Sequence, residues 1–427
     1  MSVRAINNPK LGANMSSGSN IGIRPFDLQR DLPDVKRIWQ EVGWVEDEGE
    51  IAQLDHFFAV GSTLLGTIDD VAECSVHTVP ADVYLGPESL PLCAVTAVTT
   101  SRIARGYAFA QRITAKQLAA AAQQGAAVAA LGIFDQGFYD KLGFGTGSYD
   151  HSFKFDPATL LISRKPATPV RLSKEDYAEM HRCLCERHKV HGSVCLHPPQ
   201  LYRAELGFEE NGFGLGYRKD GQLTHFVWLK PKGERGPYRV LSMAYQNTDQ
   251  LMELLALLKS LADQVYSVEL MEPPEIQLQV LLERPFRNQA ISDAGKHEAE
   301  HESFAWWQMR ILNLSACLAA FNSAVDCRFQ LELTDPLEPL LMDEVWQGIA
   351  GTYTVQLGTP SQVQAGSVGA AEDMVLRASV NALTRWLWGI QPATSLALTD
   401  DFAAPEQLLA MLDQAVVHRD PRYGWDF

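Results

Sequence analysis

A loop at residues 100–108 has the composition of a phosphate-binding site. It reads Thr-Ser-Arg-Ile-Ala-Arg-Gly-Tyr-Ala and leads directly into an alanine-rich segment expected to be helical over about residues 107–124. A helix that begins at such a loop offers unpaired backbone N–H groups and the positive end of its dipole, which together bind anions. Gly106 allows the backbone to approach a ligand closely, and two arginines add positive charge. The pattern predicts a pyrophosphate site.

A tyrosine follows one helix and one strand further along the chain. The buried strand expected at residues 127–134 is followed by the turn-rich segment GFYDKLGFG at 137–145, which places Tyr139 beyond the carboxyl end of that strand. Ligands of open α/β sheets bind at this edge, so we expect the loop and Tyr139 to face one site. Outside such a pattern, a tyrosine would be interpreted as a packed aromatic residue.

Two groups of residues have the side chains of a metal site but not its surroundings. Residues 297–301, His-Glu-Ala-Glu-His, fit the zinc-protease pattern His-Glu-x-x-His, yet their charged neighbours are typical of a solvated linker. The second group contains a Cys-x-Cys spacing that is unusual for structural zinc, so we expect no metal at either place. Its members are His181, Cys183, Cys185, His188, His191 and Cys195.

The elements that must position these residues form three segments. The first reads strand, helix, strand, loop, helix and strand, which is a crossover unit with a parallel or splayed sheet. The second repeats this order and contains a hairpin with the turn signal Asp220-Gly221. The third has a strand with clean alternation at residues 328–333, followed by apolar helices. We predict an α+β protein with a flexible tail (1–20), two mixed α/β domains (21–160 and 166–300) and a smaller α+β domain (301–427).

The composition bounds the class of protein. Of the 427 residues, 46% are hydrophobic and 21% are charged, which is ordinary for several globular domains. The sequence predicts no spanning helix and no signal peptide, and its seven scattered cysteines suit a reducing compartment, so we expect a cytoplasmic protein. The net charge of −16 disfavours nucleic acid and anionic membranes as partners and favours cationic ligands.

The loop and the tyrosine segment together resemble the GNAT superfamily of acetyltransferases. The loop resembles its pyrophosphate motif, Gln/Arg-x-x-Gly-x-Gly/Ala, and FYDKLGFG resembles its Tyr-x-x-x-Gly-Phe segment. Most of residues 21–427 also resembles the enhanced-intracellular-survival (Eis) family, notably MRILNL at 309–314 and the end Trp425-Asp426-Phe427. This resemblance implies a catalytic GNAT domain, a second GNAT-like domain without a CoA site, and a sterol-carrier-type C-terminal domain. The second segment agrees, because residues 245–250 contain no glycine or arginine.

The resemblance also implies how acetyl-CoA, the co-substrate, is bound. The strand residues Thr96, Ala97 and Val98 would pair with the pantetheine arm. The sequence departs from the family at Ile103 and Ala104, where arginines are usual, and this weakens side-chain clamping but not backbone binding. Phe134 stands where a small polar residue is common near the thioester, which leaves the acyl preference open. The pyrophosphate would be held by the backbone of Ala104, Arg105, Gly106, Tyr107 and Ala108.

The catalytic roles are implied in the same way. Tyr139 would be the general acid that protonates the CoA thiolate, and the C-terminal carboxylate on Phe427 would be the general base for the amine. Asp426 would hold the cationic substrate, although a terminal segment is ordinarily a frayed end. If the base lies elsewhere, the acidic stretch Glu46–Glu50 is the next candidate.

Two functions from different classes fit these expectations. The first is an acetyl-CoA-dependent N-acetyltransferase that acts on primary amines of polycationic small molecules such as aminoglycosides, by direct acyl transfer. The second is a non-catalytic CoA or lipid carrier. An open apolar tunnel in the last domain would favour the carrier, and a filled core with the tail directed into the first domain would favour catalysis. The family resemblance implies a homo-oligomer, a hexamer.

Overall fold

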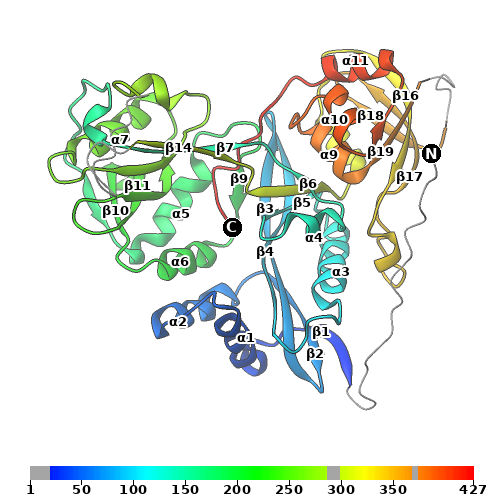
Figure 1. Ribbon diagram of the computed structural model, residues 1–427, viewed down its shortest axis with the longest axis horizontal. Helices are drawn as coiled ribbons and strands as arrows, with labels where there is room; N and C mark the ends of the chain where they lie inside the picture. The colour runs from blue at the N-terminus through cyan, green and yellow to red at the C-terminus, as the bar shows by residue number, and fades with distance from the viewer. Residues whose placement is uncertain (1–19, 286–298, 368–373) are drawn as a thin grey trace.

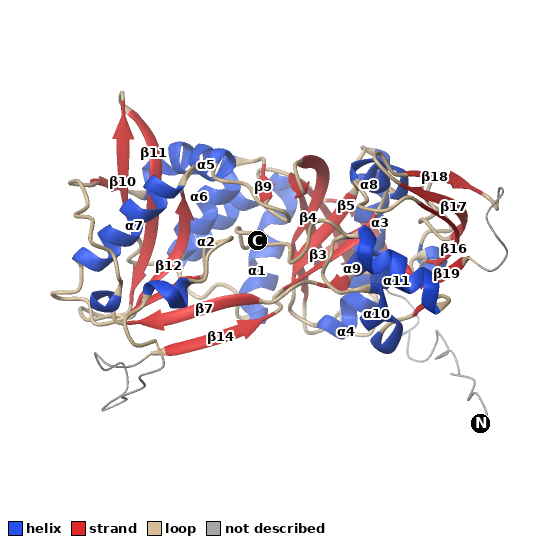
Figure 2. Ribbon diagram, turned by 90° about the horizontal axis from the view of Figure 1, so that it is seen from above, coloured by secondary structure: helices blue, strands red, loops and turns tan. Residues whose placement is uncertain are grey.

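The computed structural model describes residues 20–285, 299–367 and 374–427. The predicted tail therefore lies outside the described residues except for Asn20, as do His297 and Glu298 of the His-Glu-x-x-His pattern. Three sheets of eight, seven and five strands follow one another across the molecule, each with helices packed against it (Figures 1 and 2). These mixed α/β units confirm the predicted fold class. Within the described ranges, no helix is long and apolar enough to cross a membrane.

The first sheet carries the predicted loop and the tyrosine. Its order is β1-β2-β3-β4-β5-β15-β6, with β9 attached to β3. β4 and β5 are parallel, as the predicted crossover requires, and α3 joins them. Helix α3 packs on one face of the sheet, and α1 and α2 pack on the other (Figure 1). The bounds are β1 (Ile21–Pro25), α1 (Leu28–Val42), α2 (Glu48–Phe57), β2 (Ser62–Ile68), β3 (Val71–Leu85), β4 (Glu88–Thr100), α3 (Phe109–Gln123), β5 (Val128–Gly132), α4 (Gln136–Asp140), β6 (Gly145–Thr146), β9 (Val194–Leu196) and β15 (Trp307–Ile311).

The second sheet has the order β14-β7-β13-β12-β11-β10-β8. The hairpin predicted at Asp220-Gly221 is confirmed, because β10 and β11 are antiparallel and both turn residues have a positive φ. Helix α5, expected to reach His188, ends at Glu186 because Arg187 takes an extended conformation. The bounds are β7 (Asp150–Phe155), β8 (Val170–Leu172), α5 (Tyr177–Glu186), α6 (Pro199–Phe208), β10 (Phe213–Lys219), β11 (Gln222–Pro231), β12 (Tyr238–Ala244), α7 (Thr248–Ser260), β13 (Val268–Met271) and β14 (Glu300–Phe304).

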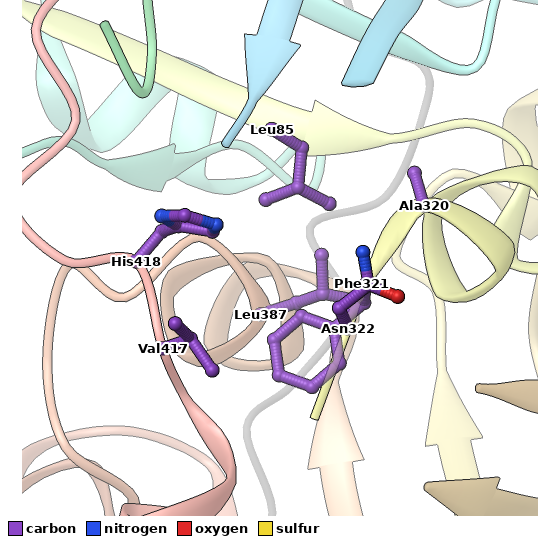
Figure 3. A pocket seen from close by; sticks show the side chains of 7 residues that line it. All are labelled: Leu85, Ala320, Phe321, Asn322, Leu387, Val417 and His418. Atoms are coloured by element: carbon purple, nitrogen blue, oxygen red, sulfur yellow. The ribbon is translucent and has the colours of Figure 1, made fainter. Parts of the chain in front are cut away.

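The third sheet has the order β18-β17-β16-β19-β20 and a filled core. The alternation at residues 328–333 lies in β16, and its inward residues pack with buried Trp386 and Trp388. A pocket where this unit meets the end of β3, lined by Leu85 and Leu387 among others, has room for about one water molecule (Figure 3). The bounds are α8 (Leu314–Ala320), β16 (Cys327–Thr334), β17 (Gly351–Leu357), β18 (Gln362–Ala365), β19 (Val375–Ser379), α9 (Val380–Leu387), α10 (Ala393–Thr399), β20 (Phe402–Ala403) and α11 (Glu406–Ala415).

The sheets do not follow the linear order of the three segments. Strand β15, although it follows residue 301, lies in the first sheet between β5 and β6. Strand β9, from the second segment, pairs with β3. Strand β7, from the first segment, lies in the second sheet. These exchanges join the first two units side by side and leave the C-terminus between them (Figures 1 and 2).

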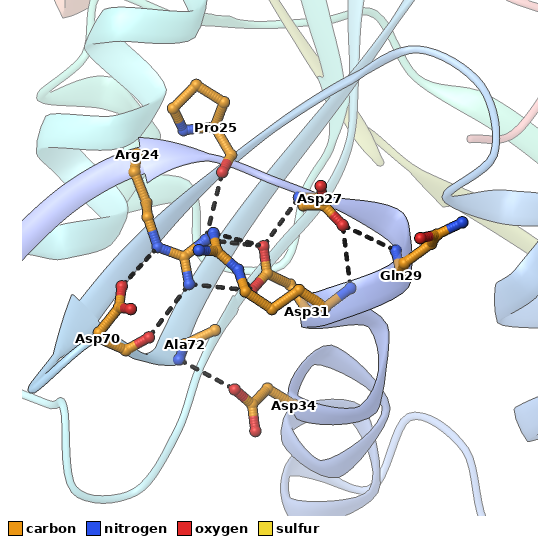
Figure 4. Close-up of polar contacts among 9 residues, drawn as sticks. Arg24, Pro25, Asp27, Gln29, Asp31, Asp34, Asp70 and Ala72 are labelled. Carbon is orange, nitrogen blue, oxygen red and sulfur yellow. Dashed lines mark hydrogen bonds and ion pairs between the residues drawn. The ribbon is translucent and has the colours of Figure 1, made fainter.

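A buried carboxylate fixes the start of α1 against the first sheet (Figure 4). Arg24 on β1 forms two hydrogen bonds with Asp31, of 2.7 and 2.9 Å. Desolvation alone would raise the pKa of Asp31, but hydrogen bonds from Arg24, Arg30 and the Asp27 backbone lower it to about 2. This ion pair positions the helix that faces the site described next.

Candidate active site

Strands β4 and β5 separate at the point where Thr96 begins the predicted pantetheine-binding run. Their parallel register runs from the pair Leu92–Val128 to the pair Val95–Leu131, after which β5 ends and β4 continues to Thr100. A bulge opposite His77 leaves Thr96 out of the pairing with β3. The Thr96 hydroxyl is buried without a partner among the described residues. A buried polar atom beside an unpaired strand edge could form hydrogen bonds with the amides of a pantetheine arm.

The predicted pyrophosphate loop has the backbone that this chemistry needs. Gly106 has a φ of +96°, and a Cβ added there would meet nothing within 4 Å. Ala108, also at positive φ, is the N-cap of α3 and makes no side-chain capping bond. The first N–H groups of α3 therefore stay available to an anion from outside the helix. No acidic side chain lies in the first turn to compete with it.

The side chains of the loop contribute less positive charge than the sequence suggested. Arg102 is held by α1. Its backbone N–H donates to the Glu41 carboxylate at 2.6 Å, and its guanidinium donates to the Glu41 backbone carbonyl at 2.9 Å. Arg105 is exposed, and so is Ile103, whose side chain is 67% accessible. We therefore expect pyrophosphate binding at this loop to depend mainly on backbone groups. Phe134, expected near the thioester, has a side chain that is 84% exposed.

Tyr139 lies on α4, a short helix that begins after β5 and is capped by Asp135. Its side chain is 7% exposed and belongs to the same apolar cluster as Val95 of β4 and Ala104 of the loop. Burial, with a smaller contribution from Asp135, raises its pKa to about 12. The phenol is thus protonated at neutral pH and able to donate a proton. None of the described residues forms a hydrogen bond with its hydroxyl group.

The C-terminal tail crosses from the third unit to the junction of the first two. Tyr423 stacks on Trp307 of β15 at 4.0 Å, and its carbonyl accepts hydrogen bonds from Arg187 and the Val194 backbone N–H at 2.9 and 3.0 Å. The ring of Phe427 stacks on Tyr423 at 6.0 Å. Both neighbouring units therefore hold the tail.

This path brings the terminal residue to the carboxyl end of β5. A Cβ added at Gly132, the last residue of β5, would lie 3.2 Å from the backbone oxygen of Phe427. The terminal carboxylate therefore lies at the sheet edge from which α4 and Tyr139 extend and at which β4 separates from β5. Sequence position gave no indication of this neighbourhood, because more than 290 residues separate the two segments.

Two further carboxylates lie beside the terminal one. The side chain of Asp426 is accessible to solvent, and its pKa is raised mainly by desolvation, which Arg239 opposes. Glu205 of α6 accepts a hydrogen bond from Trp425 Nε1 at 3.3 Å. Desolvation, opposed by that bond and reinforced by Asp426, raises the pKa of Glu205 to about 8. Glu205 was not among the residues predicted from the sequence; its position four residues after buried Leu201, on the same helix face, was the available signal.

Of the suspected metal ligands, His181 and Cys185 lie in contact, with the ring nitrogens 3.8 and 3.9 Å from the sulfur, whereas His188 and His191 have other partners. His188 pairs with Glu275, and His191 hydrogen-bonds to the Trp388 carbonyl. His301 lies on β14 beside His151. In the part of the chain that the structure describes, no three His, Cys, Asp or Glu side chains are grouped to hold a metal ion.

The class of the protein follows from this domain and its sequence. Residues 23–147 match the sequence model of the acetyltransferase (GNAT) domain, and these residues contain the splayed strands, the loop and Tyr139. The chain is therefore an acetyl-CoA-dependent N-acetyltransferase. A comparison with curated proteins found no match.

Solved structures extend the likeness to nearly the whole chain. A GCN5-related N-acetyltransferase from Kribbella flavida is 18% identical, with a TM-score of 0.74, covering 97% of this chain and 100% of that one. Eis1 from Mycobacterium abscessus is 16% identical, with a TM-score of 0.73, covering 95% and 100%. A conserved protein of unknown function from Enterococcus faecalis, described as a probable N-acyltransferase, is 15% identical, with a TM-score of 0.75, covering 95% and 100%. At these identities the likeness shows a shared fold.

Proposed function

We propose that this acetyltransferase is of the Eis type and transfers the acetyl group of acetyl-CoA to a primary amine of a polycationic, aminoglycoside-like small molecule. The main support is the place of the C-terminus, since the Phe427 backbone oxygen lies beside Gly132 at the end of β5. Asp426 adds a second carboxylate at the same place, and Glu205, whose pKa of about 8 keeps it largely protonated at neutral pH, lies next to it. A cationic amine would be attracted electrostatically to the Phe427 and Asp426 carboxylates.

In the proposed reaction the chain moves two protons. Acetyl-CoA supplies a thioester that is activated toward amines. The Phe427 carboxylate accepts a proton from the amine, whose free pKa is about 10, and the nitrogen then attacks the thioester carbonyl carbon. A C–N bond forms and the C–S bond breaks. Tyr139 donates its proton to the departing sulfur, a role that suits a phenol protonated at neutral pH. The nitrogen loses its second proton to solvent as the amide forms, and the Tyr139 phenolate regains a proton from solvent.

The filled interior of the third unit supports catalysis over the carrier alternative. Phe329, Trp386 and Trp388 are at most 1% exposed, and the pocket at the edge of this unit has room for about one water molecule. A lipid needs a cavity of several hundred Å³. The tail of this unit instead reaches the first sheet.

We also propose a homo-oligomer, a hexamer by family resemblance. Interfaces of closed symmetric oligomers bury apolar surface, and this chain exposes large apolar side chains such as Met342, Val345 and Leu398. Native mass spectrometry of the full chain tests this, because a monomeric mass at micromolar concentration contradicts it.

The test of the proposed function is the release of CoA thiol from acetyl-CoA with a panel of aminoglycosides and polyamines. We expect turnover by the native chain and a loss of roughly 100-fold or more in Tyr139→Phe. The matched control is Tyr149→Phe, which changes an exposed tyrosine outside the site. A few residues added after Phe427 should abolish turnover, whereas the same residues added before Met1 should not.

Each outcome has a separate meaning. Binding of acetyl-CoA without acetylation of any amine would overturn the proposed substrate class and favour the carrier. Full activity of the extended tail would show that the Phe427 carboxylate is not the base. The stretch Glu46–Glu50, which ends in the first turn of α2, would then be the next place to look.

A further inference from the structure

A residue of the third unit holds the backbone of the segment that carries Tyr139. This segment consists of α4, the turn after it and β6. The side-chain amide of Asn381, in the first turn of α9, donates to the carbonyls of Asp140 and Phe144, each at 2.9 Å. Helix α9 lies against β6, beside α4 (Figures 1 and 2). One side chain thus joins the last residue of α4 to the residue before β6.

A buried arginine holds the turn between these two carbonyls. Arg310 of β15 is fully buried, and one of its guanidinium nitrogens donates to the carbonyl of Leu142. Another donates at 2.8 Å to Asp335, which follows β16 in the third unit and is also buried. The Asp335 carboxylate accepts backbone hydrogen bonds from Leu337 and Ile349, at 3.0 and 3.1 Å. The ion pair therefore anchors the turn after α4 to the third unit.

Two glycines of the turn leave room for these contacts. Gly143 has a φ of +83°, and a Cβ added there would lie 2.7 Å from a guanidinium nitrogen of Arg310. A Cβ added at Gly145 would lie 2.6 Å from the backbone oxygen of Asn381. A larger residue at either position would push the turn away from β15 or from α9. The glycines thus allow both elements to approach the turn closely.

The side chain of Tyr139 takes its position from the same turn. The Tyr139 carbonyl accepts hydrogen bonds from the backbone N–H groups of Leu142 and Phe144, at 2.9 and 3.2 Å. Its ring packs against the rings of Phe138 and Phe144, with centroids 5.0 and 6.0 Å away. Helix α4 has five residues, and a helix this short needs packing against other elements to hold its place. The orientation of the phenol therefore depends on the contacts that fix the turn.

We propose that Asn381, assisted by the ion pair of Arg310 with Asp335, is a positioning residue that holds the Tyr139 phenol in place for proton transfer. The inference rests on the proposed function, in which Tyr139 is the general acid. Proton transfer requires donor and acceptor atoms within about 2.6–3.2 Å, so a small shift of the turn slows the reaction. The third unit then serves the reaction twice, because its tail carries the base and its body positions the acid.

The first measurement follows the position of Tyr139 without any activity assay. The full chain, with its 12 tyrosines, is labelled with 3-fluorotyrosine, and the fluorine NMR resonance that is lost in Tyr139→Phe is assigned to Tyr139. We expect Asn381→Ala, which removes both hydrogen bonds, to shift or broaden this resonance. The matched control is Thr394→Ala, which removes a hydrogen bond to Asp413 within the third unit and should leave the resonance unchanged. An unmoved Tyr139 resonance in Asn381→Ala overturns the proposal.

The choice of variants keeps the fold intact. Asn381 is half-buried, and the loss of two neutral hydrogen bonds costs about 1–3 kcal/mol, so we expect Asn381→Ala to fold. A second variant, Gly145→Ala, displaces α9 from the segment by steric contact and should move the same resonance. Arg310 is left unchanged in these tests, because breaking its buried ion pair would destabilise the fold strongly.

The second measurement is a double-mutant cycle in kcat for acetyl transfer. We expect Asn381→Ala to lower kcat roughly tenfold, with little change in KM for acetyl-CoA. In the Tyr139→Phe background the same replacement should lower kcat by less than about twofold, because no phenol is left to misplace. A fall of equal size in both backgrounds, or a native kcat in Asn381→Ala, overturns the proposal.

Failure of the proposed function gives a different result. A native kcat in Tyr139→Phe would show that Tyr139 is not the general acid, whatever the effect of Asn381→Ala. A chain that acetylates no amine would overturn the proposed substrate class. In both cases the fluorine resonance still decides whether Asn381 determines the position of Tyr139.

Discussion

The replacement Glu205→Gln tests how strongly its surroundings oppose the ionisation of Glu205. Glutamine keeps the shape of the side chain, and its amide oxygen can still accept the hydrogen bond from Trp425 Nε1. The substitution therefore removes the charge while it leaves the packing of α6 intact. A stability difference between the two proteins then reports the ionisation of Glu205.

The sign and size of the effect follow from the pKa. Folding raises the pKa of Glu205 from its ordinary value of 4.5 to about 8, so the folded state binds the proton more tightly than the unfolded state does. Glu205 therefore does not destabilise the folded state below pH 4.5. Its destabilising effect grows as the pH rises and reaches its full size above about pH 8. At about 1.4 kcal/mol for each pH unit, the interval from pH 5 to pH 8 amounts to about 4 kcal/mol.

Urea unfolding at a series of pH values, followed by tryptophan fluorescence, measures this. We expect Glu205→Gln to match the native chain near pH 5 and to be more stable by about 4 kcal/mol at pH 8. Glu210→Gln, which changes an exposed carboxylate just after α6, should have the same free energy of unfolding as the native chain at each pH. Parallel stability curves for Glu205→Gln and the native chain between pH 5 and 8 would refute the reasoning.

Three further predictions concern the backbone and the ion pair that position the site. Arg24→Gln should lower the free energy of unfolding by about 2 kcal/mol near pH 7, because it removes the bonds that lower the pKa of Asp31 to about 2. In the native chain this stabilisation is present above pH 4 and is lost as the pH falls through 2, which acid unfolding curves would show. Gly106→Ala should raise KM for acetyl-CoA and cost about 1 kcal/mol, since its φ of +96° strains any side chain; calorimetry and steady-state rates test this. Gly132→Ala should lower kcat roughly tenfold with little change in stability, because its Cβ would lie 3.2 Å from the Phe427 oxygen.

Each of these has a result that contradicts it. Identical acid unfolding midpoints for Arg24→Gln and the native chain would show that the ion pair does not set the pKa of Asp31. An unchanged KM for acetyl-CoA in Gly106→Ala would separate the loop from cofactor binding. Native kcat in Gly132→Ala would show that the terminal carboxylate does not act at the end of β5.

The features of this protein that are local in the chain could be predicted from its amino-acid sequence. The run from β4 through the loop to α3 was predictable because helix starts, positive-φ glycines and strand patterns depend on neighbouring residues. The turn at Asp220-Gly221 and strand β16 were predictable for the same reason. The roles of Asp426 and Phe427 came from family resemblance alone and stay predictions.

Which distant segments share the site depends on how the chain packs in three dimensions. The insertion of β15 into the first sheet, the crossing of the tail to Gly132, and the placement of Glu205 beside Asp426 depend on packing between segments far apart in sequence. No local pattern encodes them, because a residue's partners across a sheet edge or a unit boundary are set by the whole fold.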